Sequence, residues 1–329
     1  MADVVLAAVP TPFAADGSLD TACARRYFAF IADRADGMLV AGTTGEFPAL
    51  DDDERLALVE IALEVAGPDR VIAHIGAPDA YRAARLARQA VLLGARRIAA
   101  ITPYYLAPSF AEVTDYYLRI REAAPAAGLY AYIFPERTVV TVTPSQFCEL
   151  ADTVGLAGAK FSGSAARSVA LCASERPGLR IFSGDDSDLA ATLRSGGAGI
   201  ISARSAAYPE VFMGLAAALA GSAVTTSGGP ASGGPVSAGG GAASAGRGAA
   251  SAGGPALAAV SAGEAADAAA ARQADVQAIA ALGASIGLVK EALRARGFGP
   301  MAARMPVNRP DAAAAARVRD LVKALGLAD

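Results

Sequence analysis

Few of the residues that usually bind metals are present. The 329-residue sequence has one histidine, three cysteines and no tryptophan. Structural zinc needs four clustered nitrogen or sulfur ligands, so we expect no metal site. Cys23, Cys148 and Cys172 are widely spaced, which is typical of reduced thiols in a cytoplasmic protein rather than of a disulfide framework. Any catalysis must therefore rely on lysine, tyrosine, hydroxyl groups or carboxylates.

Neither sign of charge is in large excess. The chain has 29 Lys and Arg against 32 Asp and Glu, a formal net charge of −3, so we expect no nucleic-acid partner and no anionic membrane surface. No apolar run reaches the roughly 18–20 residues that a membrane helix needs. The opening segment MADVVLAAVPTPF also lacks the basic region that begins a signal peptide. These absences predict a cytoplasmic protein.

One segment differs sharply in composition from the rest. Residues 221–263 consist mainly of Gly, Ala, Ser and Pro, and Arg247 is the only charged residue among them. Such a stretch buries too little apolar surface to offset its ordering entropy, which predicts a flexible insert. It divides the chain into a barrel domain (1–220), the insert (221–263) and a C-terminal helical region (264–329).

Short apolar runs alternate with amphipathic stretches before the insert. Their β-branched content fits parallel strands buried on both faces, and Asp51–Glu54 and Asp79 are signals for helix starts between them. Eight such repeats predict a (β/α)8 TIM barrel, and the absence of a GxGxxG turn disfavours a doubly wound sheet. The runs are 4–9, 37–41, 71–75, 98–101, 129–134, 156–161, 179–183 and 198–202.

Lys160 is the strongest candidate for chemistry. It closes the apolar run GLAGAK, and active sites of TIM barrels lie at the C-terminal ends of strands. Burial disfavours the charged amine and leaves a nucleophile that can form a Schiff base with a ketone or 2-oxoacid. An ion-paired or snorkelling lysine is the alternative. His74, at another strand end, is interpreted as a core histidine, and Gly196–Gly199 is only a weak signal for a phosphate.

Other strand ends carry groups that can assist such an amine. Tyr132 supplies a phenol that can move protons, unless it is simply a core aromatic. Thr43 and Thr44 follow Gly42, where backbone N–H groups can hold a carboxylate and a hydroxyl can relay a proton; a plain turn is the alternative. Arg137 can clamp a carboxylate in bidentate fashion, or form a surface ion pair.

Several short motifs follow one another along the chain. They are PTPF (10–13), GTTGE (42–46), TPYY (102–105), Tyr-x-x-Pro-x-Arg-Thr (132–138), the Lys160 strand, SGDD (183–186) and GGAGIIS (196–202). Taken in order, these motifs resemble the dihydrodipicolinate synthase/N-acetylneuraminate lyase family of pyruvate-dependent class I aldolases. Without the insert, the resemblance covers nearly the whole chain.

The resemblance implies a mechanism that needs no cofactor and no metal. Lys160 would capture pyruvate as a Schiff base, and Tyr132 would donate and accept protons. Thr43 would link Tyr132 to Tyr105, which a neighbouring subunit would contribute. The protein is therefore expected to form a homo-oligomer, either a dimer or a tetramer.

The same resemblance implies how the substrates are held. Gly42, Thr44 and Ile201 would bind the pyruvate half. Arg137 would meet the carboxylate of the aldehyde co-substrate, which in the synthase branch is aspartate semialdehyde, and the product would be hydroxy-tetrahydrodipicolinate. In the neuraminate lyases the position of Arg137 is generally not arginine, so the synthase branch is favoured.

Four positions depart from the synthase pattern. Ile133 replaces the usual asparagine, Phe161 follows the lysine, and Phe47-Pro48 is similar to the 4-hydroxy-2-oxoglutarate aldolases. We expect these changes to alter the walls around the co-substrate. A catabolic 2-oxoacid aldolase of the same family is the close alternative. A homologue that only binds or regulates, and a metal-dependent barrel aldolase, are the more distant ones.

Overall fold

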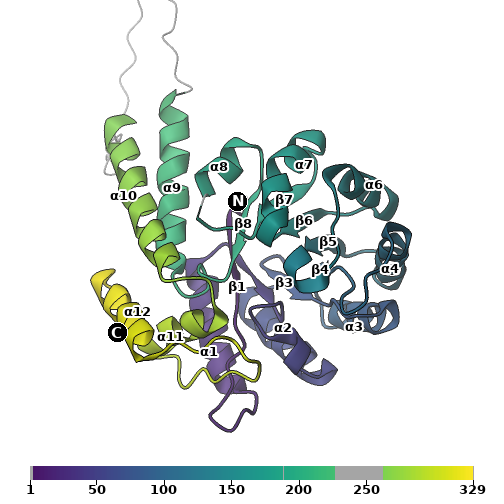
Figure 1. The fold of residues 1–329 in the computed structure, drawn as a ribbon, viewed down its shortest axis with the longest axis horizontal. Helices are drawn as coiled ribbons and strands as arrows, with labels where there is room; N and C mark the ends of the chain where they lie inside the picture. Colours follow the sequence, from purple (N-terminus) through teal and green to yellow (C-terminus); the bar gives the residue numbers. More distant parts are fainter. Residues whose placement is uncertain (1–2, 188, 227–261, 329) are drawn as a thin grey trace, which may run out of the picture.

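The computed structural model describes residues 3–187, 189–226 and 262–328. Its eight parallel strands close into one barrel in sequence order, with β8 paired to β1 (Figure 1). The predicted TIM barrel is thus confirmed. The strands are β1 (Val5–Ala8), β2 (Gly37–Val40), β3 (Val71–His74), β4 (Arg97–Ile101), β5 (Gly128–Ile133), β6 (Gly158–Phe161), β7 (Arg180–Ser183) and β8 (Gly199–Ser202).

Helices surround the barrel and continue beyond it. Both predicted helix starts are confirmed: the Asp51 carboxylate accepts a hydrogen bond from the backbone N–H of Glu54 in a capping box, and Asp79 caps α3. The α-helices are α1 (Thr21–Arg34), α2 (Asp52–Ala66), α3 (Ala80–Leu92), α4 (Phe110–Ala123), α5 (Pro135–Thr138), α6 (Pro144–Val154), α7 (Val169–Glu175), α8 (Leu189–Arg194), α9 (Pro209–Thr226), α10 (Ala262–Ala281), α11 (Ile286–Ala295) and α12 (Ala312–Ala324). Two short 3-10 helices are η1 (Phe47–Ala49) and η2 (Gly163–Ser168).

Strand alternation sorts side chains into two apolar layers. Successive residues of a strand point to opposite faces of the barrel. One layer fills the barrel interior and includes Leu39, Tyr130 and Phe182. A larger layer lies between the strands and the helices. The register pairs Tyr132 with Lys160, so both side chains reach the interior at the same level.

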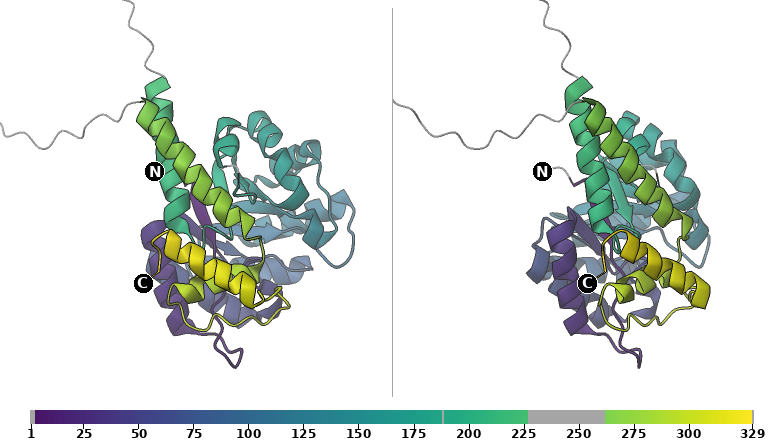
Figure 2. Two further views of the ribbon diagram at one scale, coloured as in Figure 1. Left: turned by 60° about the vertical axis from the view of Figure 1, so that its left-hand side comes forward. Right: turned by 90° about the vertical axis from the view of Figure 1, so that its left-hand side faces the viewer.

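The chain after the last strand forms two helical pairs. Helices α9 and α10 lie side by side (Figure 2), and α11 packs against α12. The expected C-terminal helical stretch is interrupted at Gly283, where φ is +108°, and the helices on either side meet at 116°. Helix α9 runs to Thr226, six residues into the predicted insert. Residues 227–261 lie outside the described residues, so the domain boundaries remain a prediction.

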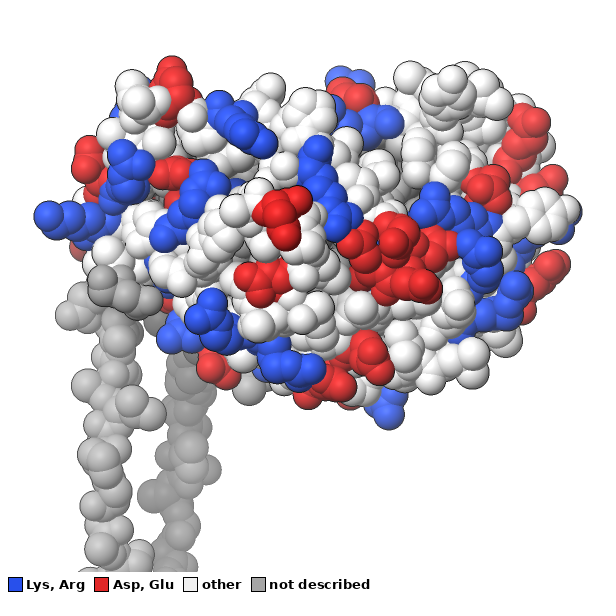
Figure 3. Space-filling view, turned by 90° about the horizontal axis from the view of Figure 1, so that it is seen from below, with Lys and Arg blue, Asp and Glu red and all other residues white. Residues whose placement is uncertain are grey.

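Acidic and basic side chains form small interspersed clusters on the face seen in Figure 3. Within the described ranges, no single helix is long and apolar enough to cross a membrane. Two helices joined by a sharp bend, Ala266–Ala281 and Ile286–Ala295, are together long and apolar enough to do so, by length and composition alone.

Candidate active site

A cavity of about 800 Å³ opens at the C-terminal ends of the strands. The loops after β2, β4, β5, β6, β7 and β8 all contribute to its walls. The connection before α11 and the segment Met305–Asn308 complete the lining. The site is thus built from both the barrel and the C-terminal helical region.

Lys160 lies in this cavity at the end of β6 and is only 7% exposed. Its Nζ atom lies 4.6 Å from the centroid of the Tyr132 ring. Among the described residues, the Lys160 side chain has neither an ion pair nor a hydrogen bond. Lys160 is therefore not ion-paired with any described residue. Its amine is available to react with a carbonyl group in the cavity.

Tyr132 and Thr43 form a hydrogen bond beside this amine. The Tyr132 phenol oxygen lies 3.2 Å from the Thr43 Oγ1 atom, at a distance where either hydroxyl can donate. Tyr132 is 2% exposed and lines the cavity, although its ring also packs in the core. Two hydroxyls in contact next to a buried amine can pass a proton to or from a bound substrate.

His74 is the core histidine that we expected, and its ring packs against that of Tyr132. Its Nδ1 lies 2.9 Å from the Ala41 carbonyl oxygen, and its Nε2 accepts a hydrogen bond from the Ile101 N–H at 3.3 Å. Burial, and then the Arg55 guanidinium, hold the pKa of His74 well below its ordinary value. A neutral ring with the proton on Nδ1 satisfies both contacts and supports the edge of the Tyr132 ring.

The proposed substrate-binding residues differ in how deeply they are buried and in whether they line the cavity. Thr44 and Ile201 are buried and line the cavity. Gly42 is also buried but lies outside the lining. Arg137 is an exposed residue at the cavity, with its guanidinium 5.6 Å from the Phe134 ring centroid and no ion pair among the described residues. A free guanidinium in this position can meet a carboxylate.

Tyr105 does not join Thr43 and Tyr132 within one chain. It is 90% exposed, lies outside the cavity lining and has a left-handed backbone with φ of +83°. The preceding residue, Tyr104, lines the cavity instead, and burial raises the pKa of its phenol. If Tyr105 takes part in a proton relay, it must act on another copy of the chain.

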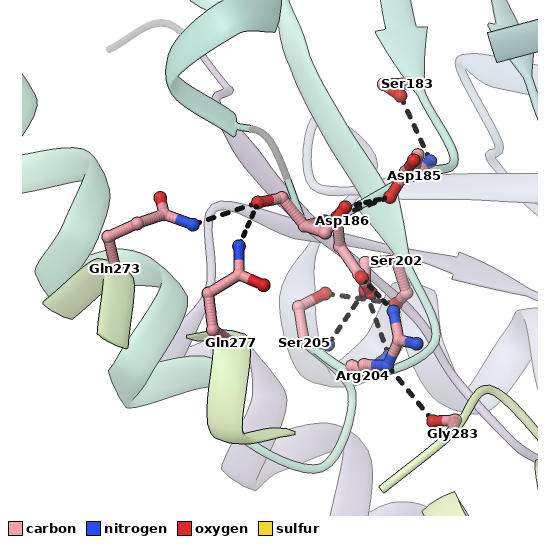
Figure 4. Close-up of polar contacts among 10 residues, drawn as sticks. Ser183, Asp185, Asp186, Ser202, Arg204, Ser205, Gln273, Gln277 and Gly283 are labelled. Carbon is pink, nitrogen blue, oxygen red and sulfur yellow. Dashed lines mark hydrogen bonds and ion pairs between the residues drawn. The ribbon is translucent and has the colours of Figure 1, made fainter. Parts of the chain in front are cut away.

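A polar network that the sequence analysis missed supports the wall after β7 and β8 (Figure 4). The buried Asp186 carboxylate accepts hydrogen bonds from the Ser202 hydroxyl and from Arg204, whose Nε also donates to the Gly283 carbonyl oxygen at 3.2 Å. Two glutamine side chains of α10 donate to the same loop. The SGDD motif marked this loop, but no sequence pattern connects it to partners that lie 79 to 90 residues further along the chain.

The expectation about the co-substrate walls is only partly correct. Ile133 and Phe161 point away from the barrel interior into the layer between strands and helices, because each follows an inward-facing residue. These two departures therefore do not shape the cavity. Phe47 and Pro48 do line it, and the Phe47 ring packs against Tyr104.

No metal centre is evident in the described part of the chain. It contains no group of three or more His, Cys, Asp or Glu residues that could hold a metal ion, and all three cysteines are free thiols.

Comparison with known proteins places this architecture in a family. The family model described as "Dihydrodipicolinate synthetase family" matches residues 1–226. A 4-hydroxy-tetrahydrodipicolinate synthase of Mycolicibacterium paratuberculosis is 37% identical over 200 residues, which are 60% of this chain and 66% of that protein. The chain thus matches just under two thirds of that relative's length.

Solved structures share the fold over almost the whole chain. A dihydrodipicolinate synthase of Thermotoga maritima has a TM-score of 0.79 at 24% identity and covers 99% of both chains. An N-acetylneuraminate lyase of Mycoplasma synoviae has a TM-score of 0.75 at 21% identity, over 98% of this chain and 97% of that one. Because both branches fit the fold, only the sequence matches carry the assignment: the chain belongs to the dihydrodipicolinate synthetase family.

Proposed function

We propose that this protein is a lysine Schiff-base lyase or synthase that condenses pyruvate with an aldehyde. The observation that carries the proposal is the setting of Lys160, a buried amine without an ion pair that faces a cavity beside the Tyr132–Thr43 hydrogen bond. A nucleophile next to hydroxyl groups that can move protons is what carbonyl capture requires.

The proposed reaction uses these three side chains in turn. The Lys160 amine adds to the ketone of pyruvate and water leaves, which gives a protonated imine. Loss of a methyl proton, with the Tyr132 phenol and the Thr43 hydroxyl as the route, converts the imine into an enamine. The enamine carbon then attacks the aldehyde, and the new alkoxide takes a proton back through the Tyr132 phenol. Water then adds to the imine carbon that this forms, its bond to the Lys160 nitrogen breaks, and the 2-oxo product leaves.

The leading specific activity is that of a 4-hydroxy-tetrahydrodipicolinate synthase. Curated relatives that are 33–37% identical carry this name. Arg137 supports it, because a free guanidinium at the cavity can hold the carboxylate of aspartate semialdehyde. Cyclisation of the condensation product would give hydroxy-tetrahydrodipicolinate.

A catabolic 2-oxoacid aldolase is the second candidate, and one observation favours it. Phe47 and Pro48 make the wall beside Thr44 bulky and apolar, at the position where the sequence is similar to 4-hydroxy-2-oxoglutarate aldolases. Such an enzyme would release pyruvate by the reverse reaction through the same imine.

The active form is proposed to be a homo-oligomer. Tyr105 points out of its own subunit, so its proposed role in the proton relay requires at least a dimer.

Borohydride trapping tests the mechanism. The chain has three lysines: Lys160 in the cavity, Lys290 in a buried ion pair and Lys323 on the surface. After incubation with pyruvate, reduction and digestion, we expect the adduct on Lys160. We expect none in Lys160→Ala, which should keep its circular dichroism spectrum, while Lys323→Ala should still be trapped at Lys160.

The same samples identify the co-substrate. A cyclic product from pyruvate and aspartate semialdehyde supports the synthase, whereas pyruvate release from 4-hydroxy-2-oxoglutarate supports the aldolase. No adduct with pyruvate or any other 2-oxoacid would contradict the proposed function. Loss of activity in a chelator would instead point to a metal-dependent aldolase.

A further inference from the structure

Glu46 is a buried carboxylate that the mechanism leaves without a role. It closes the GTTGE motif after β2 and is 0% exposed. Its Oε1 atom accepts a hydrogen bond from Lys290 Nζ at 2.5 Å, and Lys290 itself is 1% exposed. Its Oε2 atom accepts from the backbone N–H groups of Arg304 and Met305 at 2.9 and 2.8 Å. Every partner of this carboxylate belongs to the C-terminal region.

The backbone of Glu46 adopts a conformation that needs such support. Its φ is +56°, in the left-handed region that residues other than glycine seldom occupy. Three donors on one buried carboxylate hold the residue in that conformation, because breaking them would leave an unpaired charge in the interior.

The same residue closes the turn that carries Thr43. The Glu46 N–H donates to the Thr43 carbonyl oxygen at 3.0 Å. Thr11 Oγ1 donates to the carbonyl oxygen of Gly45, inside the turn, at 2.6 Å. The backbone of Glu46 therefore helps to set where the Thr43 hydroxyl lies relative to Tyr132.

The other end of the contact shapes the opposite wall. Met305 lines the cavity and donates to Glu46, and the neighbouring residues Pro306–Asn308 line it as well. One carboxylate thus joins the Thr43 turn to the segment that closes the cavity from the C-terminal side.

We propose that Glu46, held by Lys290 and by the backbone of Met305, is a positioning residue that places the Thr43 hydroxyl against Tyr132. Proton transfer then depends on the docked C-terminal region, whereas capture of pyruvate by Lys160 does not. This inference rests on the proposed function, because it assigns Glu46 to the proton-transfer step of the same site.

The test separates imine formation from turnover in the full-length protein. We expect Glu46→Gln to lower kcat about 10- to 100-fold, since small displacements of a proton-transfer group have effects of this size. The KM for pyruvate should stay within about twofold, and the pyruvate adduct trapped on Lys160 should be undiminished. Expressing kcat per trapped site removes any loss of folded protein from the comparison.

Two further variants distinguish positioning from stability. Glu46→Met combined with Lys290→Met replaces the ion pair with apolar side chains, which often preserves folding, yet it removes the acceptor of the Met305 N–H. We expect this variant to be folded, to be trapped by pyruvate and to have the same low kcat. Glu54→Gln is the matched control, because Glu54 holds the Arg304 side chain of the same segment without contacting the Thr43 turn.

The outcomes have different meanings. Low kcat per trapped site in both Glu46 variants, with normal kcat in Glu54→Gln, supports the inference. Normal kcat per trapped site in either Glu46 variant, or an equal loss in Glu54→Gln, overturns it and leaves the Schiff-base function standing. Absence of a pyruvate adduct in the unaltered protein would contradict both the proposed function and this inference.

Discussion

Tyr132 offers the sharpest test at the scale of a single residue. Replacing it with phenylalanine removes the hydroxyl that contacts Thr43 but keeps the ring beside Lys160. We expect Tyr132→Phe to form the pyruvate imine and to lose about 10²- to 10⁴-fold in kcat, the usual contribution of a positioned acid–base group.

The control for this variant lies on the same strand. Tyr130 packs inside the barrel against Phe182 and does not line the cavity. Tyr130→Phe should therefore keep kcat within a few-fold in the same assay. Comparable turnover by the two variants would remove Tyr132 from the proton-transfer step.

His74 predicts a pH dependence of stability that can be assigned to one side chain. It is the only histidine, and burial lowers its pKa in the folded state. As pH falls below about 6.5, His74 binds a proton in the unfolded chain but stays neutral in the folded chain. The free energy of unfolding should thus be steady above that pH and fall below it, by up to about 1.4 kcal/mol per pH unit.

Urea unfolding between pH 7.5 and 5.5 measures this slope. His74→Gln cannot bind the proton in either state, so its free energy of unfolding should vary less over this range, whatever its absolute value. Parallel pH profiles for the two proteins would show that the slope arises elsewhere.

The site residues that could be predicted from the sequence are those whose role is indicated by their immediate neighbours along the chain. Lys160 and Tyr132 each end an apolar strand, and the barrel topology brings strand ends together. Glu46 could not be predicted in this way, because Lys290 lies 244 residues further along and no periodic pattern records such a pair. Tyr105 was expected to join the relay from a neighbouring subunit, and that role stays a prediction because a single chain does not test it.

At the scale of elements, close strand packing around β6 holds Lys160 in register. A Cβ atom on Gly158 would lie 2.1 Å from the Arg180 carbonyl oxygen on β7. We expect Gly158→Ala to displace β6 and to reduce the free energy of unfolding by about 1–3 kcal/mol or more. Thermal or urea unfolding measures the loss, and pyruvate trapping reports whether Lys160 still reaches its substrate.

The same substitution in open space is the control. Gly178, in the turn before β7, has no atom within 4 Å of the position that an alanine methyl group would take. Gly178→Ala should change stability by no more than about 0.5 kcal/mol. An equal loss in both variants would mean that contact with Arg180 is not what requires glycine at position 158.

Elements were predictable where their signals are local. Apolar runs gave the eight strands, and Asp51 and Asp79 marked helix starts that the structure confirms. The break between α10 and α11 was missed, because Gly283 in an otherwise helical composition does not by itself end a helix.

At the scale of the whole molecule, the C-terminal region belongs to the active site. Its helices were expected as a separate region after the insert, but the connection before α11 and the segment Met305–Asn308 line the cavity. Arg204 and Gly283 join the β8 loop to this region as well (Figure 4). Sequence patterns could predict the helices but not this docking, which depends on contacts between distant residues.

Assembly gives the last prediction, because Tyr105 is exposed whereas its proposed partners, the half-buried Thr43 and the buried Tyr132, line the cavity. We expect the Lys160→Ala protein to be inactive and Tyr105→Phe to have low turnover when each is assayed alone. In a mixed dimer, one site combines an intact Lys160 from one subunit with an intact Tyr105 from the other. Random mixing should therefore restore about a quarter of the sites.

The measurement is kcat after the two variants are unfolded and refolded together, with sedimentation used to establish the oligomer. Refolding each variant separately and then mixing the products without exchange is the control. If Tyr105 acted within its own chain, every site with an intact Lys160 would lack the phenol, and co-refolding would restore nothing. Recovery of activity would place the relay across the interface, since no arrangement within a single chain supplies both residues.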